Sequence, residues 1–190
     1  MSSAVLPRLM TTEELLALPD DGLDRDLIFG QLRERPMTKR NRRHSRVMAR
    51  LGELLLNWLE RQSPPHGEVV VGETGFRLRR DPDFTVGIDL ALISAEQAAA
   101  NPDGAAIIEG SPLLAVEILS PSDKHEDIRE KIEGYLECGV PLVWEIDPDF
   151  RTVKIHRPGE EPVLVNRKQE LSAEPQLPGF RIAMTELFPK

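Results

Sequence analysis

Two carboxylates each stand alone in an apolar run that has the length of a β-strand. Asp89 lies in TVGIDLALIS, and Glu117 lies in LLAVEIL. Burying an ionised carboxylate costs several kcal/mol unless the group is paired, hydrogen-bonded or bound to a metal. Both positions therefore call for a specific role for the acid.

The residues that flank these two acids are small. With the two-residue period of a strand, Asp89 shares its face with Gly87 and Ala91. Glu117 shares its face with Ala115 and a leucine. If the two strands are antiparallel neighbours with the acids opposite each other, the two alanines also lie opposite each other and leave open space. The pattern predicts one pocket shared by both carboxylates.

The helix expected after the second strand can bring a cation to this pocket. Two carboxylates a few ångströms apart repel each other unless one is protonated or a cation lies between them. Mg²⁺ takes one or two carboxylates together with water and substrate phosphate. Lys131 lies at the margin of the helix face that carries Ile128 and Tyr135, so its stem could reach Glu117. Two acids and a lysine indicate metal-assisted hydrolysis of a phosphodiester.

Each candidate also has a simpler explanation. Asp89 could cap a neighbouring backbone, and Lys131 could be a surface lysine that pairs with Asp127. Glu73 and His44 are additional candidates for the site, since one lies near a strand end and the other at the start of a helix. A polar strand edge and a surface or capping histidine are the alternatives for these two.

Positive charge is concentrated in one segment, residues 35–50. It holds seven Lys and Arg and no Asp or Glu, which leaves −15 on the rest of a chain whose net charge is −8. Such a segment is typical of contact with backbone phosphates, although a solvated helix face is the alternative. We expect DNA as the partner, with RNA not excluded, and the predicted contacts are Lys39, Arg40, Arg42, Arg43, Arg46 and Arg50.

Length and composition set the remaining bounds. The 190 residues suit a single domain, residues 1–190, and 40% hydrophobic with 29% charged residues is ordinary for a globular protein. No segment approaches the ~20 apolar residues of a membrane span, and the first residues lack the layout of a secretory signal, so we expect a cytoplasmic protein without membrane contact. The single cysteine, Cys138, excludes an internal disulfide and argues against structural zinc.

Hydrophobic periodicity predicts an α/β or α+β protein with a mixed sheet. A strand, helix and strand over 113–147 should form a βαβ unit with parallel strands and a right-handed crossover. Asp123 is the expected N-cap of its helix. The expected helices are a short one in TTEELLALP, 43–61, a short one after 94, and 123–138; the expected strands are a pair within 25–35, then 68–80, 85–94, 111–120, 142–147 and 151–157.

Several of these stretches together resemble a known family. DLIFGQL, GIDLALIS, VEILSPSD, EKIEGYLECGVPLVWEIDP and the closing LPGF are similar to the Uma-two type family of putative restriction endonucleases, within the PD-(D/E)XK nuclease-like superfamily. The resemblance covers nearly the whole chain. It implies a restriction-endonuclease-like core, a mixed β-sheet flanked by helices with the βαβ crossover after the catalytic hairpin.

The resemblance also implies roles for residues. Asp89 and Glu117 would ligate Mg²⁺ (or Mn²⁺), and Lys131 would be the catalytic lysine moved from the strand to the following helix. Ile88 and Leu119 stand where the motif has proline and lysine. Asp26, in place of an early glutamate, is an additional candidate acid. A homodimer is expected by family likeness.

Two functions follow from this sequence. The first is a metal-dependent DNA endonuclease that hydrolyses phosphodiester bonds. The second is a catalytically inactive nuclease fold that serves as a nucleic-acid-binding or protein-interaction module, an alternative favoured by the two departures from the motif and by the acidic remainder of the chain.

Overall fold

The computed structural model describes residues 8–37, 39 and 41–189. In this part of the chain a large mixed sheet has the strand order β2–β1–β4–β6–β7–β8–β9, and β3 pairs with both β4 and β5. The sheet strands are β1 (Leu23–Ile28), β2 (Gln31–Pro36), β3 (Glu68–Arg79), β4 (Phe84–Ile93), β5 (Ile108–Glu109), β6 (Leu114–Ile118), β7 (Val143–Asp147), β8 (Thr152–His156) and β9 (Val163–Val165). The other elements are α1 (Thr12–Leu16), α2 (Arg42–Leu59), α3 (Ala95–Ala100), α4 (His125–Glu137), the pair β10 (Glu170–Ser172) and β11 (Arg181–Ala183), and α5 (Met184–Leu187).

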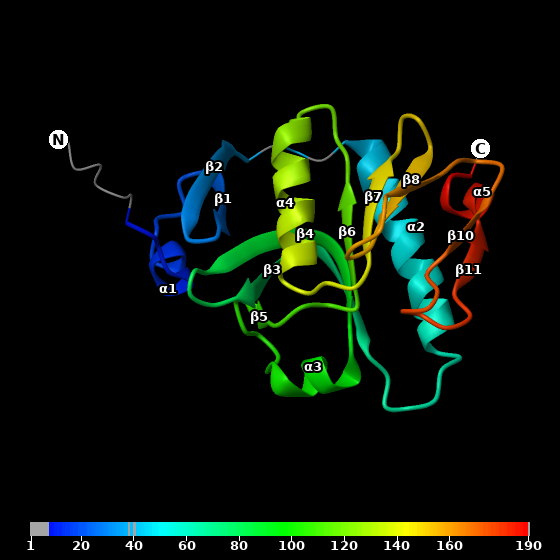
Figure 1. Cartoon of the computed structure of the whole chain (residues 1–190), viewed down its shortest axis with the longest axis horizontal. Coiled ribbons are helices and arrows are strands. Elements are labelled where there is room, and N and C mark those ends of the chain that lie inside the picture. The colour runs from blue at the N-terminus through cyan, green and yellow to red at the C-terminus, as the bar shows by residue number, and fades with distance from the viewer. Residues whose placement is uncertain (1–7, 38, 40, 190) are drawn as a thin grey trace.

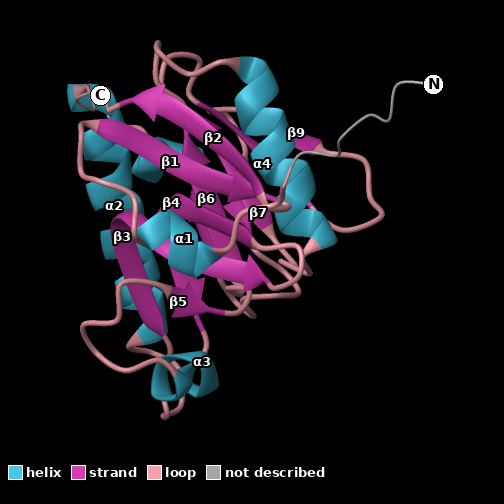
Figure 2. Ribbon diagram, turned by 90° about the vertical axis from the view of Figure 1, so that its left-hand side faces the viewer, coloured by secondary structure: helices cyan, strands magenta, loops and turns pink. Residues whose placement is uncertain are grey.

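Helices cover both faces of this sheet. Figure 2 shows α2 and α4 on opposite sides of the strands, and Figure 1 shows β10, β11 and α5 beyond α2. Along β4, Leu90 and Leu92 pack in the cluster that contains α2, whereas Ala91 and Ile93 pack in the cluster that contains α4. This alternation is the period-two pattern expected for a strand buried on both faces. The predicted mixed α/β architecture is confirmed.

The predicted strand pairing and crossover are also present. β4 and β6 are antiparallel, with Leu90 opposite Val116 and Ala91 opposite Ala115. This is the register in which Asp89 comes next to Glu117. β6 and β7 are parallel, and α4 connects them. The hairpin and the βαβ unit therefore bring the end of β6, the start of α4 and the middle of β4 to one place.

The predicted cap of the crossover helix is wrong. α4 begins at His125, and its N-cap is Lys124, whose side chain makes no capping hydrogen bond. Asp123 instead accepts a hydrogen bond at 2.7 Å from the backbone N–H of Ser120, which closes the loop after β6. A local turn competes successfully for this carboxylate because short polar side chains bond nearby backbone groups readily.

Three short strands were not anticipated from the sequence. β5, β9 and β10 contain two or three residues each, too few for a period of two to be recognised. They exist because neighbouring strands offer free edges. Among the described residues, no helix is long and apolar enough to cross a membrane.

The contact between α4 and β4 depends on a glycine. A Cβ built on Gly134 would lie 2.1 Å from Cε2 of Phe84, whose ring is fully buried. We predict that Gly134→Ala lowers the free energy of unfolding by about 1–2 kcal/mol, because overpacking of about 1–3 kcal/mol outweighs the better helix propensity of alanine. Urea denaturation measures this change.

The matched control is Glu133→Ala, one residue earlier on the exposed face of α4, which should change stability by less than about 0.5 kcal/mol. Phe84→Leu in the Gly134→Ala background should restore part of the loss. A Gly134→Ala protein as stable as the wild type would contradict this packing.

Candidate active site

The candidate site lies where the sheet splits along one edge of β4. On this edge β1 pairs with β4 only at Leu27 and Thr85, and β6 pairs with β4 only from Leu90 to Leu92. Between these two contacts the β4 backbone has no strand beside it, so its polar groups need other partners. Polar side chains from other elements supply them.

Asp89 lies at the point where β4 and β6 separate. Its Oδ2 accepts a hydrogen bond of 2.8 Å from the backbone N–H of Ile118, and its side chain is buried, with the residue 2% exposed. Its Oδ1 lies 3.2 Å from Nε2 of His44, which is fully buried at the start of α2. The surface alternative for His44 is therefore wrong, and α2 approaches the site through this histidine. The alternative role proposed for Asp89, capping of a neighbouring backbone, is therefore also present, because Asp89 accepts the hydrogen bond from Ile118 at the end of β6.

Glu117 lies one residue before the end of β6 and is 4% exposed. Its Oε1 accepts a hydrogen bond from the hydroxyl of Tyr135 and lies 3.2 Å from Nζ of Lys131. Both partners come from α4, four residues apart on one helix face. The crossover helix thus supplies the counter-ion and the hydrogen bond that a carboxylate buried in a strand requires.

Lys131 connects the acids. Its Nζ donates a 2.8 Å hydrogen bond to the carbonyl of Gly87 and lies 3.9 Å from Oδ2 of Asp26. The residue is 6% exposed, so the alternative of a surface lysine paired with Asp127 is wrong. The ammonium fills the split in the sheet and faces the carboxylates around it.

Asp26, the additional candidate acid, closes the other side of the split. Its Oδ1 accepts a 3.0 Å hydrogen bond from the N–H of Gly87, and its Oδ2 is 2.6 Å from Nη1 of Arg35. Gly87 therefore gives its N–H to Asp26 and its carbonyl to Lys131. Two side chains replace the missing strand at this residue.

Burial and mutual charge set the protonation of the cluster. Burial first, and then the neighbouring Asp89 and Asp26, raise the pKa of Glu117 to about 7 against the opposing effect of Lys131 and Tyr135. Burial would favour the neutral amine of Lys131, but the charges of Glu117 and Asp26 outweigh it and leave its pKa above the ordinary value. Burial opposes ionisation of Asp26 too, yet Lys131 and Arg35 hold its pKa low. Of Glu117 and Asp26, only Glu117 has a pKa raised above its ordinary value.

A cavity of about 440 Å³ opens onto these groups. Asp89, Glu117 and Lys131 all line it, and Glu73 lines it as well. Glu73 has a φ of +59° in an irregular part of β3, and its Oε2 lies 2.6 Å from where a Cβ on Gly87 would be. Gly87, on the same strand face as Asp89, therefore makes room for the carboxylate of Glu73. The open space predicted beside Ala91 and Ala115 is absent, because these two alanines lie opposite each other but are fully buried and do not line the cavity.

The donor set fits a hard divalent cation held by two carboxylates. Asp89 and Glu117 offer oxygen ligands at neighbouring positions of paired strands, and each raises the cost of charge on the other. Within the described part of the chain, no three His, Cys, Asp or Glu side chains are grouped closely enough to hold an ion by themselves. Water and a substrate phosphate would have to complete the coordination, which is the usual case for Mg²⁺.

The residues predicted to contact phosphate do not all lie together in the structure. Arg42, Arg43 and Arg46 line a hollow of about 430 Å³ beside the acid-lined cavity. Arg50 is turned away, with its Nε 2.9 Å from the carbonyl of Glu186 and its Nη1 2.6 Å from Glu53. Lys39 is exposed, and Arg40 lies outside the described residues.

Two residues of the cluster were missed from the sequence. Tyr135 was placed only as a core residue of its helix, although it lies on the same face as Lys131 and carries a hydroxyl that needs a buried partner. Arg35 was read as part of the basic segment, whereas it pairs with Asp24 and Asp26 across the β1–β2 hairpin. Arg33 and Arg35 are two residues apart on β2 and therefore share one face of the strand. This spacing was the signal in the sequence for the role of Arg35.

A split mixed sheet between helices, with paired carboxylates and a lysine in one cavity, defines a nuclease fold of the restriction-endonuclease-like class. The model of the Uma2 family, described as "Putative restriction endonuclease", matches residues 12–185, so the chain belongs to this family. Membership supports a nuclease-like function and implies a nucleic-acid substrate. Restriction-endonuclease-like families typically use divalent metal ions.

A solved structure shows the same fold. It is the crystal structure of a putative nuclease belonging to DUF820 from Anabaena variabilis, with a TM-score of 0.78 and 21% sequence identity over 94% of this chain and 97% of that chain. At this identity the likeness concerns the fold alone. No curated protein sequence matches the chain significantly.

The role of Lys131 as counter-ion can be tested through stability. We predict that Lys131→Met lowers the free energy of unfolding at pH 8 by about 3–5 kcal/mol, because it leaves a buried carboxylate without its partner. The loss should shrink as the pH falls below 7. Without Lys131 the pKa of Glu117 rises further above about 7. At lower pH Glu117 is therefore neutral in the folded variant, and no unpaired buried carboxylate opposes folding. Chemical denaturation at several pH values measures both effects.

Two further variants make this test specific. Lys168→Met, at an exposed turn, should leave stability unchanged. Glu117→Gln combined with Lys131→Met should recover much of the loss at pH 8. A Lys131→Met deficit that is independent of pH would contradict the pairing with Glu117.

Proposed function

We propose that the protein is a Mg²⁺-dependent DNA endonuclease that hydrolyses phosphodiester bonds at the cavity lined by Asp89, Glu117 and Lys131. The observation that carries the proposal is that these three side chains, distant in sequence, line one cavity together. Family membership supports the reaction class. We include in the proposal the homodimer expected from family likeness, since cutting both strands of a duplex needs two such sites, and a cytoplasmic location.

The residues that line the cavity have different proposed roles, which follow from their chemistry. Asp89 and Glu117 would hold the metal, which when bound lowers the pKa of water and neutralises charge on a phosphate. Lys131 is held in the split of the sheet by the carbonyl of Gly87 and faces Glu117, so its ammonium can stabilise the negative charge that develops on the phosphate. Asp26 lies 3.9 Å from this ammonium and favours its charged form, and Arg35 holds Asp26 in place through a 2.6 Å ion pair.

Lys131 supplies the positive charge that is missing at the lysine position of the family motif. Leu119 stands where the motif has lysine, two residues after Glu117. Nζ of Lys131 nevertheless lies 3.2 Å from Oε1 of Glu117, reached from the next helix. This supports an active site over the inert alternative, because the charge that the motif requires is present at the acids.

One prediction from the proposed function concerns cleavage. Glu117→Gln and Asp89→Asn should each reduce Mg²⁺-dependent nicking of supercoiled plasmid at least about 100-fold, because each removes a charged metal ligand. Glu145→Gln is the matched control. Glu145 pairs in register with Glu117 on the adjacent strand but bonds Lys154 and His156, so this variant should cut like the wild type. Circular dichroism verifies that each variant folds.

Two results would show that the proposed function is wrong. If the wild type cuts neither DNA nor RNA in Mg²⁺ or Mn²⁺, or if Glu117→Gln cuts as fast as the wild type, the proposal is wrong. Calorimetric titration with Mn²⁺ then separates the alternatives. Absence of Mn²⁺ binding that depends on Asp89 would support the non-catalytic binding module.

Another prediction from the proposed function concerns His44 as a positioning residue. Its Nε2 lies 3.2 Å from Oδ1 of Asp89, opposite the backbone hydrogen bond that Ile118 gives to Oδ2. Loss of such an outer partner typically costs about 10- to 100-fold in metal affinity. His44→Leu should weaken Mn²⁺ binding by this amount, and His44→Gln, whose amide can reach the same oxygen, should restore part of it. Equal Mn²⁺ affinity in all three proteins would assign His44 to packing alone.

A further inference from the structure

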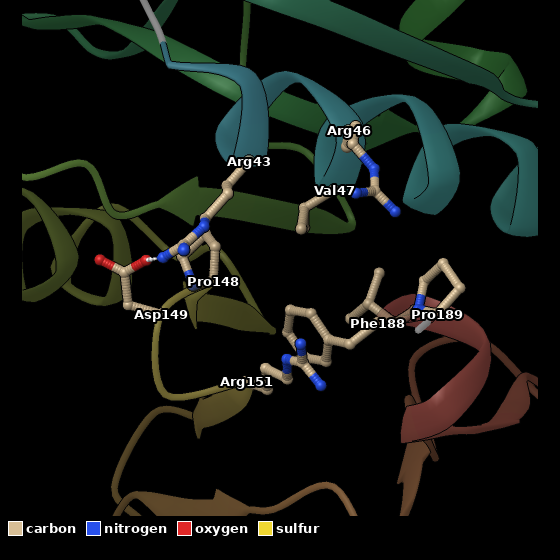
Figure 3. Close-up of a pocket in the computed structure, with 9 residues that line it drawn as sticks. Arg43, Arg46, Val47, Pro148, Asp149, Arg151, Phe188 and Pro189 are labelled. Carbon is tan, nitrogen blue, oxygen red and sulfur yellow. Dashed lines mark hydrogen bonds and ion pairs between the residues drawn. The ribbon is translucent and has the colours of Figure 1, made fainter.

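A smaller hollow lies between the start of α2, the β7–β8 turn and residues 187–189. Its volume is about 180 Å³, and Arg43, Arg46 and Arg151 line it together with Val47 and Phe188. Figure 3 shows Arg46 extending from α2 and Arg151 from the β7–β8 turn. The hollow is thus lined by three arginines and one buried aromatic residue.

Two of these arginines carry uncompensated charge. Arg43 pairs with Asp149 at the rim of the hollow. Neither Arg46 nor Arg151 has an ion pair with any carboxylate in the part of the chain that the structure describes. In a protein of net charge −8, two unpaired cations facing one hollow mark it as a site for an anion.

The turn beside the hollow is built at a cost to folding. Asp147 Oδ1 accepts hydrogen bonds of 2.9 Å from the N–H groups of both Asp149 and Phe150, which fixes the tip. Phe150 is nevertheless 81% exposed, and Arg151 has a φ of +55°, where glycine or asparagine would be less strained. A residue pair that stability does not favour, on a rigid tip, indicates contact with another molecule.

This surface is continuous with the candidate active site. Arg43, Arg46 and Asp149 line both the small hollow and the 430 Å³ hollow, whose lining also includes Pro121. The next residue, Ser122, lines the acid-lined cavity. The three cavities therefore follow one another along the edge of the sheet where β6 and β7 end.

We propose that this arginine hollow and Phe150 bind a single-stranded segment of the nucleic acid beside the bond that is cut, an inference that rests on the proposed nuclease function. Arg46 and Arg151 hold a backbone phosphate, and Phe150 stacks on an unpaired base. Basic side chains along the backbone with an aromatic ring against a base are the means by which proteins bind single strands without reading their sequence. A paired base is inaccessible to such stacking, so the substrate has an unpaired region.

Binding can be measured apart from cleavage. Fluorescence anisotropy in EDTA compares a labelled oligodeoxythymidylate of about 16 nucleotides with a blunt duplex of the same length. Phe150→Ala should weaken single-strand binding about 5- to 100-fold, as expected for loss of one stacked base, and leave duplex binding unchanged. Arg46→Ala and Arg151→Ala should each reduce the salt dependence of single-strand binding by about 0.7 in the logarithmic slope.

Matched controls are Leu164→Ala, an exposed apolar residue on β9, and Lys168→Ala, an exposed cation that does not line the hollow. Both should bind the oligonucleotide like the wild type. The inference is overturned if the wild type binds no single strand, if Phe150→Ala binds like the wild type, or if it loses duplex affinity equally.

The two proposals fail in different ways. If the wild type cuts no nucleic acid but Phe150→Ala and the arginine variants lose single-strand affinity, the nuclease function is wrong and the binding surface stands. If Glu117→Gln abolishes nicking while the Phe150 and arginine variants bind and cut normally, the surface is wrong and the nuclease function stands.

Discussion

The split along β4 is the constraint on which the site depends. Between Thr85 and Leu90 one edge of this strand has no strand partner, and buried backbone groups must still be hydrogen-bonded. The structure satisfies Gly87 with Asp26 and Lys131 and satisfies the end of β6 with Asp89. Charged groups are thereby fixed in a buried place by hydrogen bonds that the sheet would otherwise make itself.

This arrangement has an electrostatic consequence. Asp26, Asp89 and Glu117 share one buried region with Lys131 and the half-buried Arg35, and the charges compensate one another incompletely. Burial, together with the neighbouring Asp89 and Asp26, raises the pKa of Glu117 to about 7 against the opposing effect of Lys131 and Tyr135. A site that holds more negative charge than its own cations neutralise is suited to take up a divalent cation.

The helix α2 links this cluster to the arginine hollow. Its first turn carries His44 against Asp89 on the buried side and Arg43 and Arg46 on the open side. One rigid element therefore sets both the geometry of a candidate metal ligand and the position of the cations expected to meet phosphate. Its 18 residues pack through Val47, Leu51 and Leu55 onto the sheet, which keeps that relationship fixed.

The sequence by itself determined the elements and the unusual residues within them. Three features could be recognised from the sequence: isolated acids in apolar strands, small neighbours beside them, and a lysine at the margin of a helix face. They could be recognised because burial of charge is costly and periodicity is local. The split in the sheet, the burial of His44, the hydroxyl of Tyr135 on Glu117 and the pairing of Arg35 with Asp26 were decided only by the tertiary structure. These depend on which distant segments meet, and no spacing within one segment encodes the partner that another segment brings. The short strands β5, β9 and β10 belong to the same class, because a neighbouring edge rather than their own residues makes them strands.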